Sequence, residues 1–224
     1  MKIETFAQTD VGPALASRVA NDLRSALSAN DKASIAVPGG TTPGPFLSAL
    51  SSEMMEWGKI SVTLSDERCV PADHERSNQR LVSHHLLQGP AKAARFIPLY
   101  FGNQEIGGIE ESLRENALPL DVCVLGMGND MHTASLFPGT PGLAALLDPN
   151  GKRLADFVSP PGADEPRVTL TASALATASN TYLLIKGADK RAALDRAMKT
   201  EARQAAPIRA ILESAKSPTI FYAD

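Results

Sequence analysis

The sequence predicts an α/β fold in which a mostly parallel sheet carries helices on both faces. Apolar strand-like segments alternate with amphipathic or Ala-rich helical segments along the 224 residues. Connections of helical length between strands favour parallel pairing, with helices covering both sides of the sheet. The chain is 43% hydrophobic, which suits one domain with a full core. We therefore expect a single domain over residues 1–224, in which the Gly- and Pro-rich stretch 138–166 could form a small lobe or lid.

Each expected element rests on a local pattern. The expected strands share short runs of apolar or β-branched residues and lie at 1–7, 33–38, 60–64, 96–100, 120–125, 167–170, 181–186 and 219–222. The expected helices share helical periodicity or high Ala content and lie at 13–28, 46–57, 77–87, 106–116, 171–178, 188–199 and 208–214. Asp10 and Ser77 are expected N-caps, and the small hydroxyl residues of 133–135 are expected to open a further helix.

Charge and cysteine content exclude several classes of protein. The net charge is −3, so nothing favours binding to nucleic acid or to an anionic membrane. The N-terminal residues lack a signal-peptide core, and no stretch is long enough to span a bilayer. Cys69 and Cys123 form no CxxC pair. Free thiols in a reducing compartment are the simpler interpretation, so we expect a cytoplasmic protein.

A first candidate site follows the strand at 33–38. Gly39 and Gly40 allow a sharp turn and close backbone approach, and Thr41 and Thr42 precede the next helix. Free N–H groups at a helix start, together with hydroxyls, can hold a phosphate. A tight turn with a Thr cap explains the same residues equally well. The loop is neither a Walker A loop nor a GxGxxG motif.

A second cluster follows the strand at 60–64. Asp66, Glu67 and Arg68 stand at its carboxyl end, and Ser77 and Asn78 follow within one loop. Arg binds phosphate or carboxylate well because its guanidinium forms two parallel hydrogen bonds. Taken alone, a surface ion pair and a helix cap would account for these residues.

The third cluster, 126–138, follows the strand at 120–125. Two glycines are followed by Asp130 and His132, two residues apart. Asp130 could orient His132 as a general base or acid, because imidazole exchanges protons near neutral pH. A His that only caps a helix or binds a carbonyl is the alternative. Ser135 lies in no GxSxG elbow, and the four histidines offer no zinc-ligand spacing, so we expect no metal.

Two further cations complete the pattern. Lys190 lies near the start of the helix at 188–199, and Arg167 opens the strand at 167–170. Taken alone, Lys190 is better explained as part of a solvated helix face, and Arg167 is a weaker candidate of the same kind. Ligands of open α/β sheets bind beyond the carboxyl ends of the strands, where the four clusters converge. That convergence predicts an enzyme acting on a small phosphorylated substrate without a metal.

These motifs resemble a known family. The segments GGTTP at 39–43, DERCVP at 66–71 with Ser77-Asn78, and LGMGNDMHTASLFP at 125–138 resemble those of 6-phosphogluconolactonases that share their fold with glucosamine-6-phosphate isomerases/deaminases. The segments PRVTLT at 166–171 and GADKR at 187–191 resemble later parts of the same family. The match runs in order through nearly the whole chain, and the segment 125–138 is the most specific.

The resemblance implies a function. It implies a Rossmann-like α/β fold and hydrolysis of 6-phospho-D-glucono-1,5-lactone to 6-phosphogluconate in the oxidative pentose phosphate pathway, with no cofactor. The implied phosphate site is Gly40, Thr41, Thr42, Arg68 and Lys190, and the implied catalytic pair is His132 with Asp130. The only expected partner is this small sugar-phosphate lactone, bound by a monomer or a weak homodimer.

One position departs from the family pattern. Family members usually have Asp-Gly-His, whereas this chain has Asp130-Met131-His132. If φ is positive there, Met costs about 1 kcal/mol or more relative to Gly. Asn129, often acidic in relatives, is a milder change.

Two other functions remain open. An amino-sugar-phosphate isomerase/deaminase needs a carboxylate base; such relatives resemble this chain but have Tyr after Asp-Glu and a Glu soon after the His. Here Arg68 follows Asp66-Glu67, and 133–139 contains no acid. Both differences favour the lactonase. A non-catalytic sugar-phosphate sensor on the same fold is the second alternative, for which Met131 is the only argument.

Overall fold

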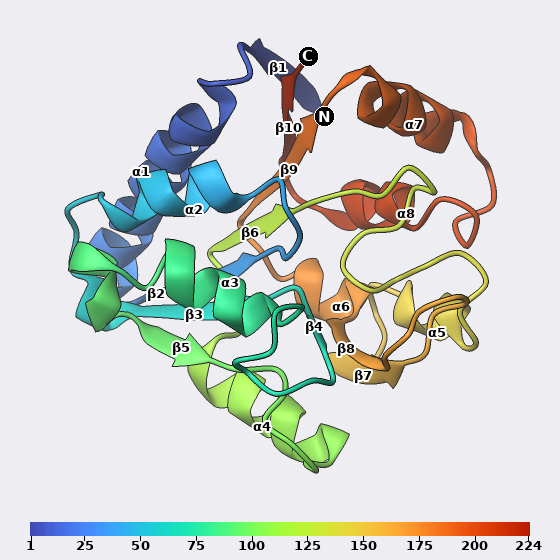
Figure 1. Ribbon diagram of the computed structural model, residues 1–224, viewed down its shortest axis with the longest axis horizontal. Coiled ribbons are helices and arrows are strands. Elements are labelled where there is room, and N and C mark those ends of the chain that lie inside the picture. The colour runs from blue at the N-terminus through green and yellow to red at the C-terminus, as the bar shows by residue number, and fades with distance from the viewer.

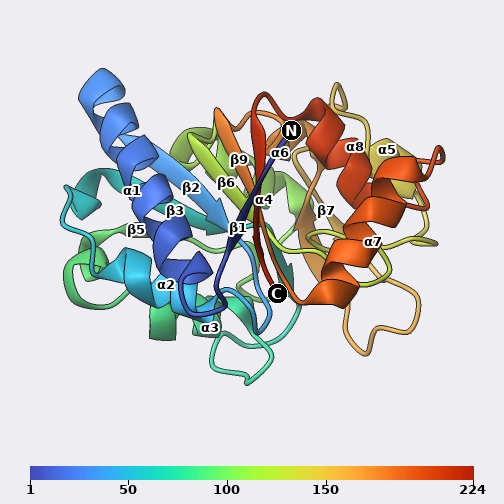
Figure 2. The ribbon, with the colours of Figure 1, turned by 90° about the horizontal axis from the view of Figure 1, so that it is seen from above.

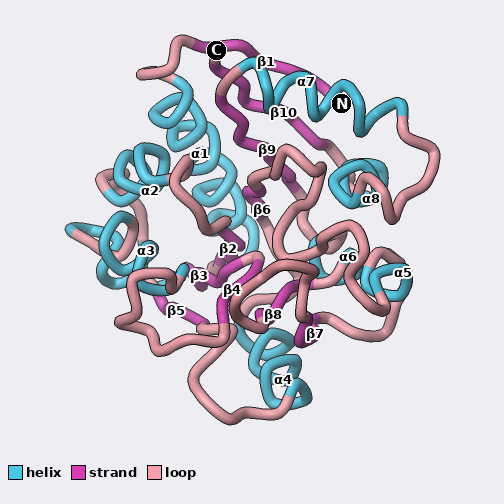
Figure 3. Tube along the Cα trace, turned by 45° about the vertical axis from the view of Figure 1, so that its right-hand side comes forward, coloured by secondary structure: helices cyan, strands magenta, loops and turns pink.

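The computed structural model describes all residues 1–224 and contains a seven-stranded sheet in the order β1-β10-β9-β6-β2-β3-β5. All six pairings in it are parallel, as the sequence predicts. Figure 3 shows these strands side by side in one row. The strands are β1 (Lys2–Phe6), β2 (Ala33–Val37), β3 (Ile60–Leu64), β5 (Arg95–Ile97), β6 (Val122–Leu125), β9 (Asn180–Lys186) and β10 (Pro218–Ala223).

Helices cover both faces of this sheet. The helices are α1 (Val11–Asn30), α2 (Gly44–Ser51), α3 (Asn78–His85), α4 (Ile106–Asn116), α5 (Leu143–Leu146), α6 (Ala172–Leu175), α7 (Ala188–Lys199) and α8 (Pro207–Ser214). Figure 2 shows α1 and α2 on one side of the long strands and α7 and α8 on the other (Figure 1 gives the same elements face on). None of the helices has the length and apolar character that a membrane span requires.

The strand order reverses between β2 and β6. From β2 the chain continues outward to β3 and β5, whereas from β6 it continues in the opposite direction to β9 and β10. The connections after β2 and β6 therefore diverge, and a crevice opens between them at the carboxyl ends of the strands. This crevice is where the motif at 39–43 and the motif at 126–138 come together.

A second, three-stranded antiparallel sheet was not predicted. It has the order β4 (Asp66–Arg68), β8 (Arg167–Leu170), β7 (Ala155–Val158) and lies beside the large sheet (Figure 3). Only β8 is expected from the sequence. β4 has three residues, and β7 lies in the Gly- and Pro-rich stretch, so neither carries a periodic pattern of its own. Both form because β8 lies between them and supplies hydrogen-bond partners from a distant part of the chain. One continuous cluster of buried apolar side chains runs through both sheets.

Several boundaries differ from the expectation, and one expected helix is wrong. The helix expected at 46–57 begins at Gly44 and ends at Ser51, and a 3-10 turn follows at Trp57–Lys59. Residues 133–135 open no helix; they form a tight turn closed by a bridge between Thr133 and Leu136. Ala134 has a φ of +50°, which an α-helix of L-residues does not accommodate.

Other boundaries agree closely. Helices α4 and α7 begin and end at the predicted residues. Ser77 caps α3 as predicted, because its hydroxyl accepts from the backbone N–H of Arg80 at 3.2 Å. Asp10 stands at the N-cap position of α1, but its side chain makes no capping hydrogen bond.

Candidate active site

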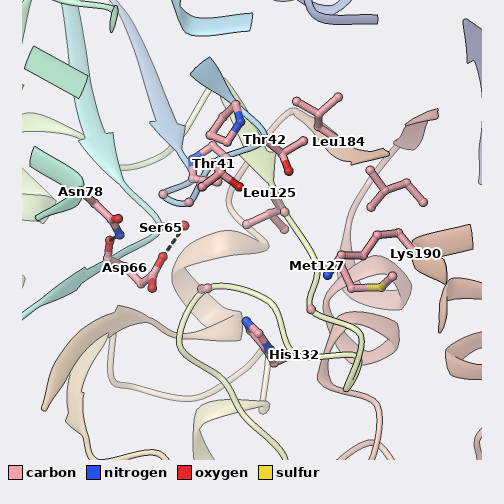
Figure 4. Close-up of a pocket in the computed structure, with 18 of the residues that line it drawn as sticks. Thr41, Thr42, Ser65, Asp66, Asn78, Leu125, Met127, His132, Leu184 and Lys190 are labelled. Carbon is pink, nitrogen blue, oxygen red and sulfur yellow. Dashed lines mark hydrogen bonds between the residues drawn. The ribbon is translucent and has the colours of Figure 1, made fainter. Parts of the chain in front are cut away.

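One cavity of about 290 Å³ lies at the carboxyl ends of β2, β3, β6 and β9. It gathers residues from all four predicted clusters: 38–43, Ser65, Asp66, Arg68, Asn78, 125–128, His132, Ala134, Arg167, 184–186 and Lys190. In Figure 4, Thr41 and Thr42 lie on one side of the cavity and His132 on another, with Asp66 and Lys190 between them on opposite walls. The cavity holds four cationic side chains, those of Arg68, Arg167, Lys186 and Lys190, against the single carboxylate of Asp66. This balance favours an anionic ligand.

The Gly-Thr loop leads directly into α2. Gly40 has a φ of +91°, a conformation that a residue with a side chain rarely adopts. At Gly39 a Cβ atom would lie 2.0 Å from Oδ1 of Asn78, so only glycine lets Asn78 approach this closely. Thr41 and Thr42 line the cavity just before the helix starts. The loop therefore places two hydroxyl side chains, just before a helix start, at one end of the cavity.

Arg68 is held in place by two acceptors. Its Nη1 donates to the carbonyl of Arg76 at 2.7 Å and to Oδ1 of Asn78 at 3.1 Å. Asn78 in turn donates through Nδ2 to the carbonyl of Asp66 at 2.8 Å. The Nε of Arg68 is buried and has no hydrogen-bond partner. The guanidinium is thus oriented by the protein while part of its donor capacity stays unused, as a phosphate ligand would require.

Glu67 and Ser77 do not line this cavity. The Glu67 carboxylate is 2% exposed and accepts from the backbone N–H groups of Arg68, Asn78 and Gln79 at 2.7–2.8 Å and from the Ser77 hydroxyl at 3.1 Å. Burial raises the pKa of the Glu67 carboxyl, and these four hydrogen bonds oppose that shift. Both side chains anchor the start of α3 instead of facing the cavity. They act on the site by fixing Asn78, so the expectation of direct ligand contact does not fit their position.

Asp66 and Arg167 face each other across the small sheet. Asp66 accepts from the hydroxyls of Ser65 at 3.1 Å and Ser135 at 2.6 Å, and Nη1 of Arg167 lies 3.9 Å from its carboxylate. Arg167 has a buried Nε without a partner. Desolvation lowers the pKa of Arg167, and the charge of Asp66 opposes this shift. β4 and β8 pair Arg68 directly with Arg167, which explains why two arginines reach one cavity.

The strand β9 and the helix α7 supply the remaining cations. Lys186 ends β9, and Lys190 lies in the first turn of α7, after Gly187 with a φ of +88°. Lys186 donates to the carbonyl of Gln8 at 3.1 Å. The structure shows no ion pair at Lys190, whose side chain lines the cavity. Lys190 is therefore available to an anionic ligand.

Asp130 and His132 form the predicted pair. Nδ1 of His132 lies 2.5 Å from Oδ1 of Asp130, which also accepts from the backbone N–H of His132 at 3.3 Å. The His132 side chain is 26% exposed and lines the cavity, whereas Asp130 lies behind it and does not. A carboxylate at Nδ1 favours the tautomer that carries its proton there, which leaves Nε2 as the acceptor.

The backbone around this pair is unusual. A Cβ at Gly128 would lie 2.2 Å from the His132 ring and 2.3 Å from Oδ1 of Asp130, so these side chains occupy the space that a larger residue would need. Met131 has a φ of +68°, a left-handed conformation that glycine adopts without steric cost and Met does not. Its carbonyl accepts from the N–H of Ile208 at 3.1 Å, and Arg196 donates to the carbonyl of Asn129 at 3.2 Å. Contacts from α7 and α8 thus hold the turn in a strained conformation.

Sequence reasoning missed several residues of the site. Ser65 and Lys186 end or follow strands at the same edge of the sheet, so the rule that identified their neighbours could also have identified them. Met127 lies between the two glycines of a motif that was recognised. Phe137, whose ring stacks on His132, carries no such signal, because its position depends on the turn at 133–136.

Comparisons with known proteins point to one family. A profile of the family described as glucosamine-6-phosphate isomerases/6-phosphogluconolactonase matches residues 7–221. A 6-phosphogluconolactonase of Mesorhizobium japonicum is 48% identical over 94% of this chain and 90% of its own length. A 6-phosphogluconolactonase of Pseudomonas aeruginosa is 45% identical over 89% of this chain and 86% of its own length.

Solved structures lead to the same result. The crystal structure of a 6-phosphogluconolactonase from Shewanella baltica superposes with a TM-score of 0.95 at 36% identity, covering 100% of this chain and 98% of the other. The α/β fold and the family predicted from the motifs are both confirmed. The chain belongs to the glucosamine-6-phosphate isomerase/6-phosphogluconolactonase family.

Proposed function

We propose that the protein hydrolyses 6-phospho-D-glucono-1,5-lactone to 6-phospho-D-gluconate, the lactone-opening step of the oxidative pentose phosphate pathway. The observation that carries this proposal is that one cavity joins a cationic end to an oriented Asp–His pair. The cationic end suits a phosphate, and the pair suits general acid–base chemistry on the lactone. The sequence similarity to proteins named 6-phosphogluconolactonase supports the same substrate.

The phosphate is assigned to the cationic end. Thr41 and Thr42 offer hydroxyls next to the start of α2, and Arg68 offers donors that the protein does not use. Lys190 adds a charge from the opposite wall (Figure 4). Binding at a group remote from the reaction orients the lactone carbonyl toward the other end of the cavity. Asp66 would repel a phosphate, so we assign it, with Arg167, to the polar groups of the sugar ring.

The chemistry is assigned to His132. Nε2 accepts a proton from a water molecule as the water oxygen attacks C1, and Asp130 stabilises the imidazolium that forms. The tetrahedral intermediate then collapses, the bond between C1 and the ring oxygen breaks, and the imidazolium returns its proton to that oxygen. One water is consumed, and one carboxylic acid and one hydroxyl are produced. A lactone is an activated ester, so a general base suffices and no covalent nucleophile is needed.

The isomerase/deaminase alternative is less well supported. That reaction needs a carboxylate base at C2, and Asp66 is the only acid that lines the cavity. Two serine hydroxyls already donate to its carboxylate. A sensor would not require the Asp130–His132 contact, which is present despite the strain at Met131.

One experiment separates the three functions. Acid release is followed with freshly generated 6-phosphogluconolactone and compared with spontaneous hydrolysis, and glucosamine-6-phosphate is assayed in parallel. Acid release well above background supports the lactonase. Turnover of glucosamine-6-phosphate alone would support the isomerase/deaminase. Thermal stabilisation by 6-phosphogluconate without turnover of either substrate would indicate a sensor.

A further inference from the structure

The turn at 133–136 brings an aromatic ring against the imidazole of His132. Thr133 and Leu136 form an antiparallel bridge, in which the N–H of Leu136 donates to the carbonyl of Thr133 at 3.0 Å. Ala134, the first residue between them, has a φ of +50°. Residues on either side of so tight a bridge face one another. His132, which precedes Thr133, and Phe137, which follows Leu136, therefore face one another.

The two rings are closely stacked. Their centroids lie 3.8 Å apart, and their planes differ by 19°. The guanidinium of Arg167 lies over the same Phe137 ring, 5.3 Å from its centroid. Ser135 ties the turn to the small sheet, because its hydroxyl donates to Asp66 at 2.6 Å and its N–H donates to Oγ1 of Thr169 at 3.1 Å. The Phe137 ring is thus held by parts of the chain that are remote from His132.

A hydrogen bond alone does not fix the orientation of an imidazole. The contact between Nδ1 of His132 and Oδ1 of Asp130 sets one direction, but the ring can still rotate about the line that joins these atoms. A ring stacked at 3.8 Å removes that freedom, because rotation would drive imidazole atoms into the aromatic face. Together the two contacts determine both the direction and the plane of the imidazole.

We propose that Phe137 is a positioning residue that fixes the plane of the His132 imidazole, so that Nε2 keeps its direction toward the cavity. The inference deepens the proposed function and rests on it, since the role concerns the proton transfer assigned to His132. Phe137 itself needs no contact with the substrate. Its loss is therefore expected to lower kcat and to leave substrate binding almost unchanged.

The kinetic test replaces the ring by an apolar side chain that cannot stack. For Phe137→Leu we expect kcat to fall by about 10-fold or more, since small misplacements of a catalytic group reduce rates strongly, while KM stays near the wild-type value. Phe137→Tyr keeps the ring and should restore most of kcat. Phe157→Leu is the matched control, because Phe157 lies on β7 of the small sheet, is 39% exposed and does not line the cavity. It should leave both constants unchanged.

A spectroscopic test needs no substrate. The stacked ring should shift the ring-proton NMR signals of His132 upfield, and Phe137→Leu should move them downfield while the signals of the other three histidines stay in place. The spectrum of His132→Gln identifies the signals of His132. If the wild-type protein does not hydrolyse the lactone, the proposed function fails, but the NMR comparison still reports on the stack.

Two results would overturn the inference. The first is a Phe137→Leu enzyme with wild-type kcat, even if the His132 signals move. The second is a pair of spectra in which the His132 signals of wild type and variant coincide. If Phe137→Leu does not give a folded circular dichroism spectrum, Phe137→Met replaces it, because its flexible side chain fills the space without presenting a flat face, and the same two criteria apply.

Discussion

The two ends of the cavity are built in different ways. The cationic end comprises 39–42, Arg68, Gly187 and Lys190, and its two positions with a positive φ, Gly40 and Gly187, are glycines. The turn that carries His132, here the His132 turn, comprises 128–137, and its left-handed positions are Met131 and Ala134. Glycine adopts a positive φ without steric cost, whereas Met and Ala do not. The backbone of the cationic end is therefore relaxed, and that of the His132 turn is strained.

The difference shows where each end obtains its geometry. The cationic end lies at junctions between strands and helices, where N–H groups and side chains already point into the crevice. The His132 turn has no regular structure of its own and depends on hydrogen bonds with α7, α8 and the small sheet. Changes at the cationic end should therefore appear in KM, and changes in the turn should appear in kcat and in stability.

The largest effect is expected at His132. His132→Ala should lower kcat by about 100-fold or more, because the general base is lost, while KM changes little. The initial rate of acid release at saturating lactone measures this, with the spontaneous rate subtracted. His84→Ala, on the exposed side of α3, serves as the control. Near-normal turnover by the variant would remove His132 from the mechanism.

A substitution at Gly128 should produce a smaller loss of the same kind. In Gly128→Ala the added methyl would lie 2.2 Å from the His132 ring, so the ring and Asp130 must both move. We expect kcat to fall by about 10-fold or more, with the circular dichroism spectrum preserved. Gly107→Ala on α4, where a Cβ has no neighbour within 4 Å, is the matched control. Equal activities of the two variants would contradict the close packing described for the turn.

At the cationic end the effect should shift from kcat to KM. Arg68→Ala removes hydrogen bonds to a charged group, each worth about 1.5–3 kcal/mol, so KM should rise by about 10- to 100-fold with kcat largely kept. Lys190→Ala should change KM in the same direction. Arg114→Ala, an arginine of α4 whose side chain is 53% exposed, is the control. An unchanged KM for Arg68→Ala would exclude Arg68 from the phosphate site.

The strain at Met131 can be measured by comparing two variants. Met131→Gly and Met131→Ala both remove the long side chain, but only glycine is relaxed at a φ of +68°. The glycine variant should be more stable by about 1 kcal/mol, which corresponds to about 2–4 °C in Tm for a chain of this size. Thermal unfolding of both proteins under identical conditions gives the difference. Equal Tm values would mean that the turn stores no measurable strain.

The smallest effect concerns Cys69, the neighbour of Arg68. Burial raises the pKa of the Cys69 thiol to about 11, and the nearby Glu67 charge adds to this shift; burial alone raises that of Cys123 to about 12. Both thiols are therefore protonated near neutral pH, and reactivity rises only as the pH approaches these values. Alkylation by iodoacetamide at pH 8 should be much slower than in the urea-unfolded chain. Rapid labelling of Cys69 in the native protein would contradict this.

Local pattern was sufficient for much of the fold and of the site. Apolar runs predicted the parallel sheet, because a strand buried on both faces has consecutive apolar residues. Helical periodicity predicted the limits of α4 and α7. The rule that strand ends form the crevice predicted that Arg68, His132 and Lys190 would meet in one cavity.

Only the tertiary structure decided the rest. The three-stranded sheet pairs Arg68 with Arg167, about a hundred residues apart, through hydrogen bonds that no local pattern encodes. The Glu67 side chain points into the protein because N–H groups at the start of α3 donate to its carboxylate. The stacking of Phe137 on His132 depends on a backbone turn that neighbouring elements keep strained. Residue type and spacing determined which groups reach the cavity. Their orientation there came from long-range contacts, because a side chain turns toward whatever partner the folded chain provides.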